Sequence, residues 1–221
     1  QNVAKKGAGI SSLRCKNIFM YKCSLMMNTA GYLGGGIYIE DIDNTVISKT
    51  HFITNKAIEG GSIYLLKIKF CTILSCGLIK NTGVNKGGGL QIKPDLERNI
   101  QSRVAILYCL FYGNLASEEG SAINVELVLA VTISDTPIML NSKQNTTGAS
   151  VFVQSKALYL NNISFDNIIE RVLILDLSIS FQSDFKNVTF LCPPRTYLHE
   201  HPFAHQEEEP FPVWYSCKSC D

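Results

Sequence analysis

Residues 34–55 have the sequence GGGIYIEDIDNTVISKTHFITN, and residues 60–81 have the sequence GGSIYLLKIKFCTILSCGLIKN. Each stretch opens on a glycine-rich turn, continues with Ile-Tyr, and ends on an asparagine 18 residues after the first isoleucine. Two markers held at one distance in neighbouring stretches indicate a repeated structural unit.

The same two markers recur along most of the chain. A glycine-rich turn followed by an aliphatic residue ends at Ile10, Ile37, Ile63, Leu90, Ile123 and Val151. A motif of the form [F/L/I]-x-x-N ends at Asn28, Asn55, Asn81, Asn114 and Asn141. The glycine turns are 27, 26, 27, 33 and 28 residues apart, and the asparagines are 27, 26, 33 and 27 apart. This period is typical of a solenoid.

Short strands build the predicted unit. After each glycine turn the residues alternate between apolar and polar, as in Leu90-Gln91-Ile92, and similar runs precede each asparagine. A third strand is expected between them, near Ile42 and Ile68, and no stretch shows a sustained helical period. The sequence therefore predicts an all-β fold, a right-handed parallel β-helix of six to seven coils over residues 1–190. Residues 191–221 would form a linker and the start of a cysteine-rich module.

The two markers have expected structural roles. The asparagines would stack on their equivalents in the next coil as an amide hydrogen-bond ladder. The glycines would occupy corners where a positive φ or a close backbone approach excludes a Cβ atom. The expected corner glycines are Gly35, Gly36, Gly60, Gly61, Gly88 and Gly89.

Composition and one insertion narrow the possible functions. The net charge is +1 and no basic cluster is visible, which argues against a nucleic-acid partner. The longest apolar run, Leu127–Ile133, is too short for a membrane helix, so any membrane anchor is expected outside this segment. The chain also shows no signal peptide, and we expect the natural protein to extend in both directions. The unit with six extra residues holds the charged, proline-containing stretch 93–103. It would bulge as a loop, either as part of a binding face or as a tolerated surface insertion.

The repeats resemble a known family. GGGI, GGSI and GGGL paired with FITN, LIKN and FYGN are similar to the GGA-[I/L/V] and FxxN repeats of the polymorphic membrane proteins of chlamydial surfaces. The likeness covers about residues 7–167, and this chain differs by preferring Gly or Ser in the third position. The resemblance implies a parallel β-helix of the pectin-lyase type, displayed outside the cell and associated with adhesion.

The eight cysteines form two groups. Cys23, Cys76 and Cys109 share one position of the repeat, and with Cys15 and Cys71 they are expected to face the interior as small hydrophobic residues. A bridge between Cys76 and Cys109 is an alternative to free stacked thiols. In the tail, Cys192, Cys217 and Cys220 predict disulfides of an extracellular module, with a metal site as the alternative. Three sequons, at Asn145, Asn162 and Asn187, are candidate glycosylation sites if the protein is secreted by a eukaryote.

Catalytic and metal-binding chemistry has weak support in the sequence. Polysaccharide lyases and hydrolases on this scaffold need clustered carboxylates, and the best candidate is Glu40-Asp41-Ile42-Asp43. Its equivalents in the neighbouring coils are Leu66-Lys67-Ile68-Lys69 and Lys93-Pro94-Asp95-Leu96. One acidic patch beside lysines does not make a carboxylate cluster, and a solvated corner explains it better. His199, His201 and His205 are weak metal candidates because prolines interrupt their segment. We therefore expect no cofactor.

Three functions remain open at this stage. The first is a non-catalytic, extracellular structural or adhesion protein whose partners are proteins or glycans at the cell surface. Its binding face would include an exposed strip formed by Tyr38, Tyr64 and Gln91, which occupy equivalent positions in successive units. The second is a carbohydrate-active enzyme on the same fold. The third is a scaffold piece of a large assembly.

Overall fold

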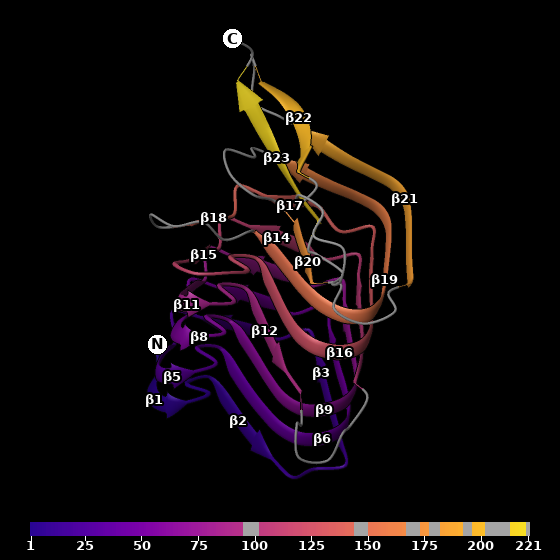
Figure 1. The fold of residues 1–221 in the computed structure, drawn as a ribbon. Helices are drawn as coiled ribbons and strands as arrows, with labels where there is room; N and C mark the ends of the chain where they lie inside the picture. The colour runs from indigo at the N-terminus through magenta and orange to yellow at the C-terminus, as the bar shows by residue number, and fades with distance from the viewer. Residues whose placement is uncertain are drawn as a thin grey trace.

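The computed structural model describes residues 1–94, 102–143, 150–166, 173–176, 182–191, 196–201 and 213–219. Within these ranges the chain contains no helix, and parallel strands stack into a solenoid of about 6 turns (Figure 1). The predicted all-β parallel solenoid is confirmed.

One coil consists of a long bent strand and two short ones. In the first complete coil these are β6 (Ile37–Ser48), β7 (His51–Ile53) and β8 (Lys56–Glu59), and in the next they are β9 (Ile63–Leu74), β10 (Gly77–Ile79) and β11 (Thr82–Lys86). The long strand joins two of the predicted strands, and the strand between the asparagine and the next glycine turn was not predicted. Its sequence, as in Lys56–Glu59, is short and lacks a clear alternation.

The remaining strands repeat this plan before and after these two coils. The first coil contains β1 (Val3–Lys6), β2 (Ile10–Leu13), β3 (Asn17–Tyr21), β4 (Ser24–Met26) and β5 (Thr29–Leu33). The middle coils contain β12 (Leu90–Lys93), β13 (Arg103–Leu107), β14 (Leu110–Tyr112), β15 (Leu115–Ala116), β16 (Ile123–Ser134), β17 (Ile138–Met139) and β18 (Ser142–Lys143). The last elements are β19 (Val151–Asp166), β20 (Leu173–Asp176), β21 (Gln182–Leu191), β22 (Thr196–His201) and β23 (Val213–Ser219).

Successive coils pair in parallel and in register. Ile37 lies opposite Ile63, and Ile47 lies opposite Ile73. Strands β1, β5, β8, β11, β15 and β18 form one six-stranded sheet, and the other strands belong to a second, larger sheet. Both sheets run along the solenoid (Figure 1), so a side chain's neighbours come from equivalent positions of adjacent repeats.

The coils turn at four corners, each built on a single residue with positive φ. At the corner before the long strand of a coil, the residue with positive φ is glycine, as in Gly34 (φ 64) and Gly60 (φ 62). The other corners use diverse residues: Arg14, Asp41, Lys67 and Leu127 at the bend of the long strand, Lys22, Lys49, Ser75, Tyr108, Asp135, Asn162 and Asn187 at its end, and Met27, Thr54, Lys80, Gly113 and Leu140 before the asparagines.

Only the corner before the long strand needs glycine, because a Cβ atom has no space there. A Cβ atom on Gly34 would overlap the carbonyl oxygen of Ile37, three residues further along the chain. The next glycines lie against the following coil, and a Cβ atom on Gly36 would be 2.8 Å from the carbonyl oxygen of Ser62. Of the six glycines named from the sequence, Gly60 has positive φ. The other five, Gly35, Gly36, Gly61, Gly88 and Gly89, are places of close backbone approach.

The core is a set of stacked apolar columns. One column runs through the six coils as Leu25, Phe52, Leu78, Phe111, Ile138 and Phe165, and all six side chains are buried. Because every coil presents the same face inward, like side chains touch along the axis. Each such burial stabilises the fold by about 1.5–3 kcal/mol.

A ladder of buried asparagines borders this column. The Nδ2 atom of Asn55 donates to Oδ1 of Asn81 at 3.1 Å and to the carbonyl oxygen of Leu25 at 2.9 Å. Oδ1 of Asn55 accepts from both the backbone N–H and Nδ2 of Asn28. Equivalent bonds link Asn81 to Asn114 and Asn114 to Asn141. The amide groups inside the ladder thus find all of their hydrogen-bond partners in neighbouring coils.

A second, shorter ladder was not predicted. At the position that follows the corner ending the long strand, a hydroxyl or thiol accepts the backbone N–H of the preceding coil. The Thr50 hydroxyl accepts from Cys23, the Cys109 sulfur from Cys76, and the Thr136 hydroxyl from Cys109. Cys76 and Cys109 are therefore buried hydrogen-bonding groups and not simply small hydrophobic residues. The hydrogen bond with Cys76, followed by burial, raises the pKa of the Cys109 thiol above its usual range.

The other described cysteines differ in exposure. Cys15, Cys23, Cys71, Cys76 and Cys109 are all free thiols. Cys71 is buried, as expected, and burial raises the pKa of its thiol to about 12. The prediction for Cys15 was wrong: it lies exposed on the first coil, where it contacts Ser12.

The tail contains strands that the sequence did not predict. Strands β22 and β23 pair antiparallel with each other, and β23 also pairs antiparallel with β20 of the last coil. Cys217 lies on β23 opposite Leu198, whereas Cys192 and Cys220 lie outside the described residues. The predicted disulfides of the tail therefore remain predictions.

Candidate binding groove

A shallow groove crosses the outer face of strands β9, β13, β16 and β19, which belong to four consecutive coils. Its floor is a grid of two columns of outward-facing residues, set by the in-register pairing of these strands. One column is Phe70, Arg103, Ala130 and Ala157, and the other is Thr72, Ala105, Thr132 and Tyr159. Leu129 and Lys156 also line it, and the groove has a volume of about 660 Å³.

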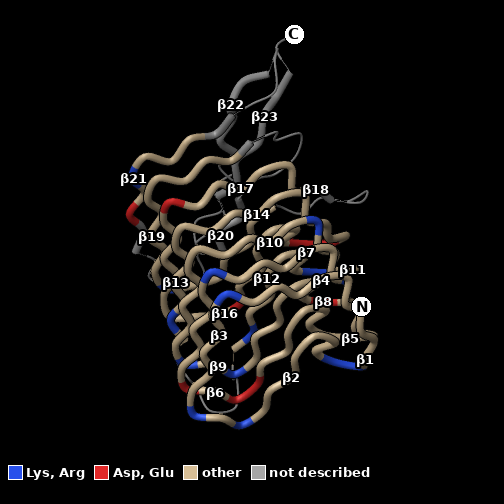
Figure 2. Tube along the Cα trace, turned by 180° about the vertical axis from the view of Figure 1, so that it is seen from behind, with Lys and Arg blue, Asp and Glu red and all other residues tan. Residues whose placement is uncertain are grey.

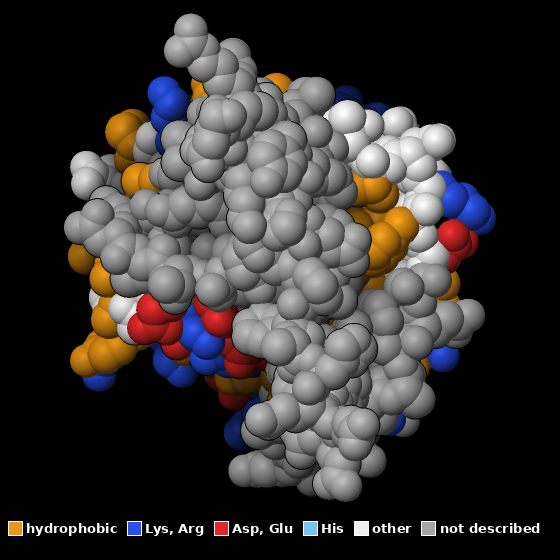
Figure 3. Space-filling view, turned by 45° about the horizontal axis from the view of Figure 1, so that its top comes forward, with side chains coloured by type: hydrophobic (Ala, Val, Ile, Leu, Met, Phe, Trp, Pro, Cys, Tyr) orange, Lys and Arg blue, Asp and Glu red, His pale blue; other side chains and the backbone are white. Residues whose placement is uncertain are grey.

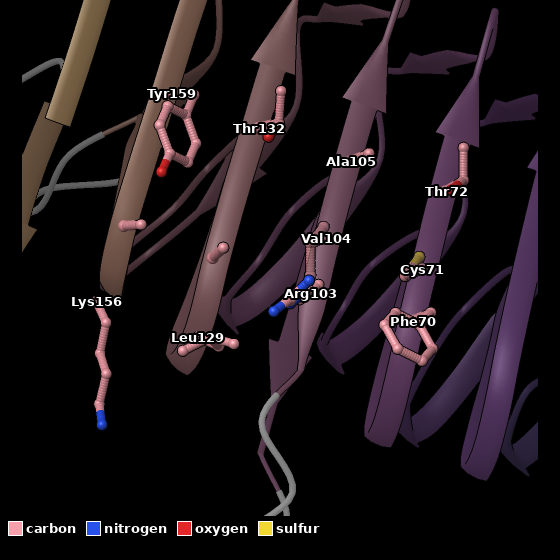
Figure 4. Close-up of a pocket in the computed structure, with 12 residues that line it drawn as sticks. Phe70, Cys71, Thr72, Arg103, Val104, Ala105, Leu129, Thr132, Lys156 and Tyr159 are labelled. Carbon is pink, nitrogen blue, oxygen red and sulfur yellow. The ribbon is translucent and has the colours of Figure 1, made fainter. Parts of the chain in front are cut away.

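The groove exists because small residues occupy five of the eight positions of this grid. Three alanines and two threonines keep the floor low, and the larger side chains of Phe70, Arg103 and Tyr159 rise from it. Phe70 and Tyr159 lie at opposite ends in Figure 4, with Arg103 between them. Phe70 is 43% exposed and Arg103 is also exposed, so both can reach a ligand.

Among the described residues that line the groove, two are cationic and none is acidic. Arg103 and Lys156 supply two positive charges, and within the described chain no carboxylate pairs with either of them. Lys69 adds a third cation at the Phe70 end, where its Nζ atom lies 5.8 Å from the ring centre. Basic residues are also spread over the other coils, with fewer acidic residues between them (Figure 2). Among the described residues, the groove thus combines cations with a lining that has no carboxylate.

Sequence reasoning missed this groove. Its residues come from four repeats and carry no shared motif, and the signal is an absence of large side chains at outward positions. That signal becomes visible only after the long strands are placed in register, which aligns Ala105, Ala130 and Ala157 with their neighbours.

The binding strip expected from the sequence was wrong. Tyr38 and Gln91 are 0% exposed, and Tyr64 is 4% exposed. They lie outside the core, in the angle between the two sheets, because the six-stranded sheet brings its own side chains over them. Lys6 of that sheet donates to the Tyr38 hydroxyl at 3.3 Å.

Ion pairs fill the same angle between the sheets. Nζ of Lys93 lies 2.7 Å from a carboxylate oxygen of Glu59, and Lys86 lies 3.7 Å from both Glu119 and Glu126. Figure 3 shows acidic and basic side chains gathered side by side on one flank of the molecule. The two rings of Tyr38 and Tyr64 stack with their centres 5.7 Å apart. The ion pairs, the hydrogen bond between Lys6 and Tyr38 and the stacked rings link the groups of this angle, so we assign it a structural role.

The acidic stretch at residues 40–43 does not form a carboxylate cluster. The Tyr38 hydroxyl donates a short hydrogen bond to Glu40, Asp41 turns the corner with φ 60, and Asp43 is exposed. Burial, followed by the hydrogen bond and negative charge of Glu40, raises the pKa of Tyr38 above its usual range. In the described ranges no cluster of three His, Cys, Asp or Glu side chains could hold a metal ion.

The three candidate metal-binding histidines and the three sequons are distributed over the C-terminal part of the chain. His199 and His201 lie on β22, and His205 lies outside the described residues, as does Asn145. Asn162 and Asn187 are exposed and turn the same corner of adjacent coils, with φ values of 53 and 52. Asn162 donates to Asp135 of the preceding coil at 2.7 Å, and this bond, with one from Ser134, lowers the pKa of Asp135. Glycosylation at these sites stays a prediction.

Comparison with known proteins adds one partial match. The chain is 28% identical over 167 residues to the metabotropic glutamate receptor-like protein R of Dictyostelium discoideum. The match covers 75% of this chain and 10% of that protein, so the chain spans about a tenth of the length of the relative it matches. No protein-family model matches the chain, and no solved structure does. The solenoid agrees with a pectin-lyase-like fold. In the described residues no helix is long and apolar enough to span a membrane.

Proposed function

We propose that this chain is a non-catalytic binding segment of an extracellular or cell-surface protein, and that the groove over β9, β13, β16 and β19 is its binding face. The observation that carries the proposal is the combination of an exposed ring, a partly exposed ring, cations and a floor of small residues on one sheet. Aromatic rings placed on strands lose little conformational freedom on binding, which favours recognition by such a surface.

The comparison supports the location in a limited way. A relative whose name describes a receptor-like protein is compatible with a role at the cell surface. The repeats also resemble those of a family associated with adhesion.

Binding is a better proposal than catalysis for this groove. Hydrolysis or elimination on a glycan requires carboxylates or another acid–base pair that converge on one bond. The described lining residues supply hydroxyl, guanidinium and ammonium groups, but no carboxylate or imidazole. Release of reducing ends or unsaturated products from a panel of polysaccharides would contradict this part of the proposal.

The proposal can be tested with the fluorescently labelled chain and cells of the organism that makes it. The variant Ala130→Glu places a larger, negatively charged side chain on the groove floor without touching the core. The matched control is Val84→Glu, at an exposed site on β11 in the other sheet. We expect Ala130→Glu to lose most cell binding and Val84→Glu to keep it. Equal binding by both variants would exclude the groove as the binding face.

A further inference from the structure

We propose that the ligand of this groove is an anionic polysaccharide, bound in an extended form along the solenoid axis. This inference rests on the proposed binding function and adds the chemical class of the ligand. It is carried by the spacing of the rings, by the charge of the groove and by the direction in which the groove crosses the strands.

The rings are placed to stack on sugars at two positions. Phe70 and Tyr159 stand on β9 and β19, which are three strand spacings apart, or about 14 Å along the axis. A linear glycan presents flat C–H faces at regular intervals along its length, and aromatic rings pack against such faces. Between the rings the floor around Arg103 consists of alanines and threonines, and the hydroxyls of Thr72 and Thr132 can bond to sugar hydroxyls.

The charge of the groove selects acidic sugars. Arg103 lies midway along the groove, and Lys69 and Lys156 lie near its two ends. The nearest described acid beyond Tyr159 is Asp184, whose carboxylate is paired with Lys186 at 2.9 Å. Guanidinium and ammonium groups bind carboxylates or sulfates by charge-assisted hydrogen bonds, and a neutral glycan would offer these cations no charged group.

The direction of the groove favours a glycan over a peptide. The groove runs across four strands whose backbone N–H and C=O groups are already used in pairing with one another. An extended peptide in this direction would find no sheet edge to pair with, so its own backbone groups would lack the partners that strand addition provides. A polysaccharide has no such requirement, because side chains alone can satisfy its hydroxyl and acidic groups.

The test uses affinity electrophoresis of the whole chain in native gels that contain one of three polymers with the same backbone. Carboxymethyl cellulose and cellulose sulfate are anionic, with different acidic groups, and hydroxyethyl cellulose is neutral. We expect retardation by one or both anionic polymers, weakening as salt is added, and little retardation by the neutral one. Equal retardation by the neutral polymer, or none by either anionic polymer, would overturn the inference.

Four variants assign the binding to the groove. Arg103→Ala should weaken binding about tenfold, and its matched control Arg14→Ala, which removes the same charge from an exposed corner of the first coil, should not. Tyr159→Ala should also weaken binding, whereas Tyr32→Ala, on the other sheet, should not. All four residues are at least partly exposed, and unchanged circular dichroism checks that each variant folds. If Arg103→Ala and Arg14→Ala behave alike, the ligand does not occupy this groove.

The two proposals can fail separately. If Ala130→Glu abolishes cell binding while no anionic polymer retards the wild-type chain, the groove binds another class of partner. Only the inference on the ligand then fails. If Ala130→Glu leaves cell binding intact, the proposed function itself fails.

Discussion

The asparagine ladder predicts that replacing an asparagine by alanine lowers the stability of the fold, and by more inside the ladder than at its end. Replacing Asn81 by alanine removes four side-chain hydrogen bonds: two accepted from the backbone and side chain of Asn55, one donated to the carbonyl oxygen of Phe52 and one donated to Asn114. The backbone N–H of Asn81 keeps its bond to Asn114. All of these groups are buried, so water cannot replace the lost partners.

The magnitude follows from the groups left without a partner. The backbone N–H and one amide hydrogen of Asn55 lose their only acceptor, and each buried unsatisfied group costs about 1–3 kcal/mol. We expect Asn81→Ala to lower the free energy of unfolding by about 4 kcal/mol. The matched variant is Asn28→Ala at the end of the ladder, where the N–H of the exposed residue Asn2 loses its bond and can turn to water. Its cost should be about 1 kcal/mol.

Urea unfolding followed by circular dichroism measures both values, and amide hydrogen exchange at Asn55 reports the loss locally. Exchange at this amide should accelerate strongly in Asn81→Ala. The reasoning is refuted if the two variants cost the same, or if Asn81→Ala costs less than about 1 kcal/mol.

Three further predictions concern the corners and the thiols. Gly34→Ala should destabilise the fold by more than about 2 kcal/mol, because φ at Gly34 is positive and a Cβ atom would overlap the carbonyl oxygen of Ile37. The control Gly31→Ala should be tolerated, because the nearest atom to its Cβ would be 3.8 Å away. Urea unfolding midpoints of the two variants test this difference. The pKa of the Cys71 thiol is about 12 in the fold against 9.0 as the ordinary value, so unfolding releases its proton at alkaline pH. Its contribution to stability is complete below about pH 9 and is lost as pH rises toward 12, so the urea midpoint should fall over this window, and less steeply in Cys71→Ala. Iodoacetamide at neutral pH should modify the exposed Cys15 rapidly and Cys71 only on unfolding, as peptide mass spectrometry would show; rapid modification of Cys71 would contradict the described burial.

Much of the fold follows from local sequence. The glycine turn and the asparagine recur at one distance because each meets a local need: Gly34 turns a corner that has no space for a Cβ atom, and Asn55 satisfies backbone groups of the adjacent coil. Needs of this kind repeat with every coil, so the period, the parallel stacking and the buried asparagines could all be predicted. The Thr50 and Cys109 ladder escaped prediction because hydroxyl and thiol alternate at one position, which hides the shared role of accepting an N–H.

The solenoid and its inward columns can be derived from the repeat alone, since inward residues touch their own equivalents and one repeat is enough to define the contact. Which outward residues line a groove became clear only from the three-dimensional arrangement of the coils. Tyr38 and Tyr64 point out of the core yet are covered, because a second sheet folds back over them. Ala130 and Arg103 define a groove only when four strands lie in register. An outward side chain's surroundings depend on how far the coil bends and on side-chain sizes in other repeats, and neither is encoded within a single unit.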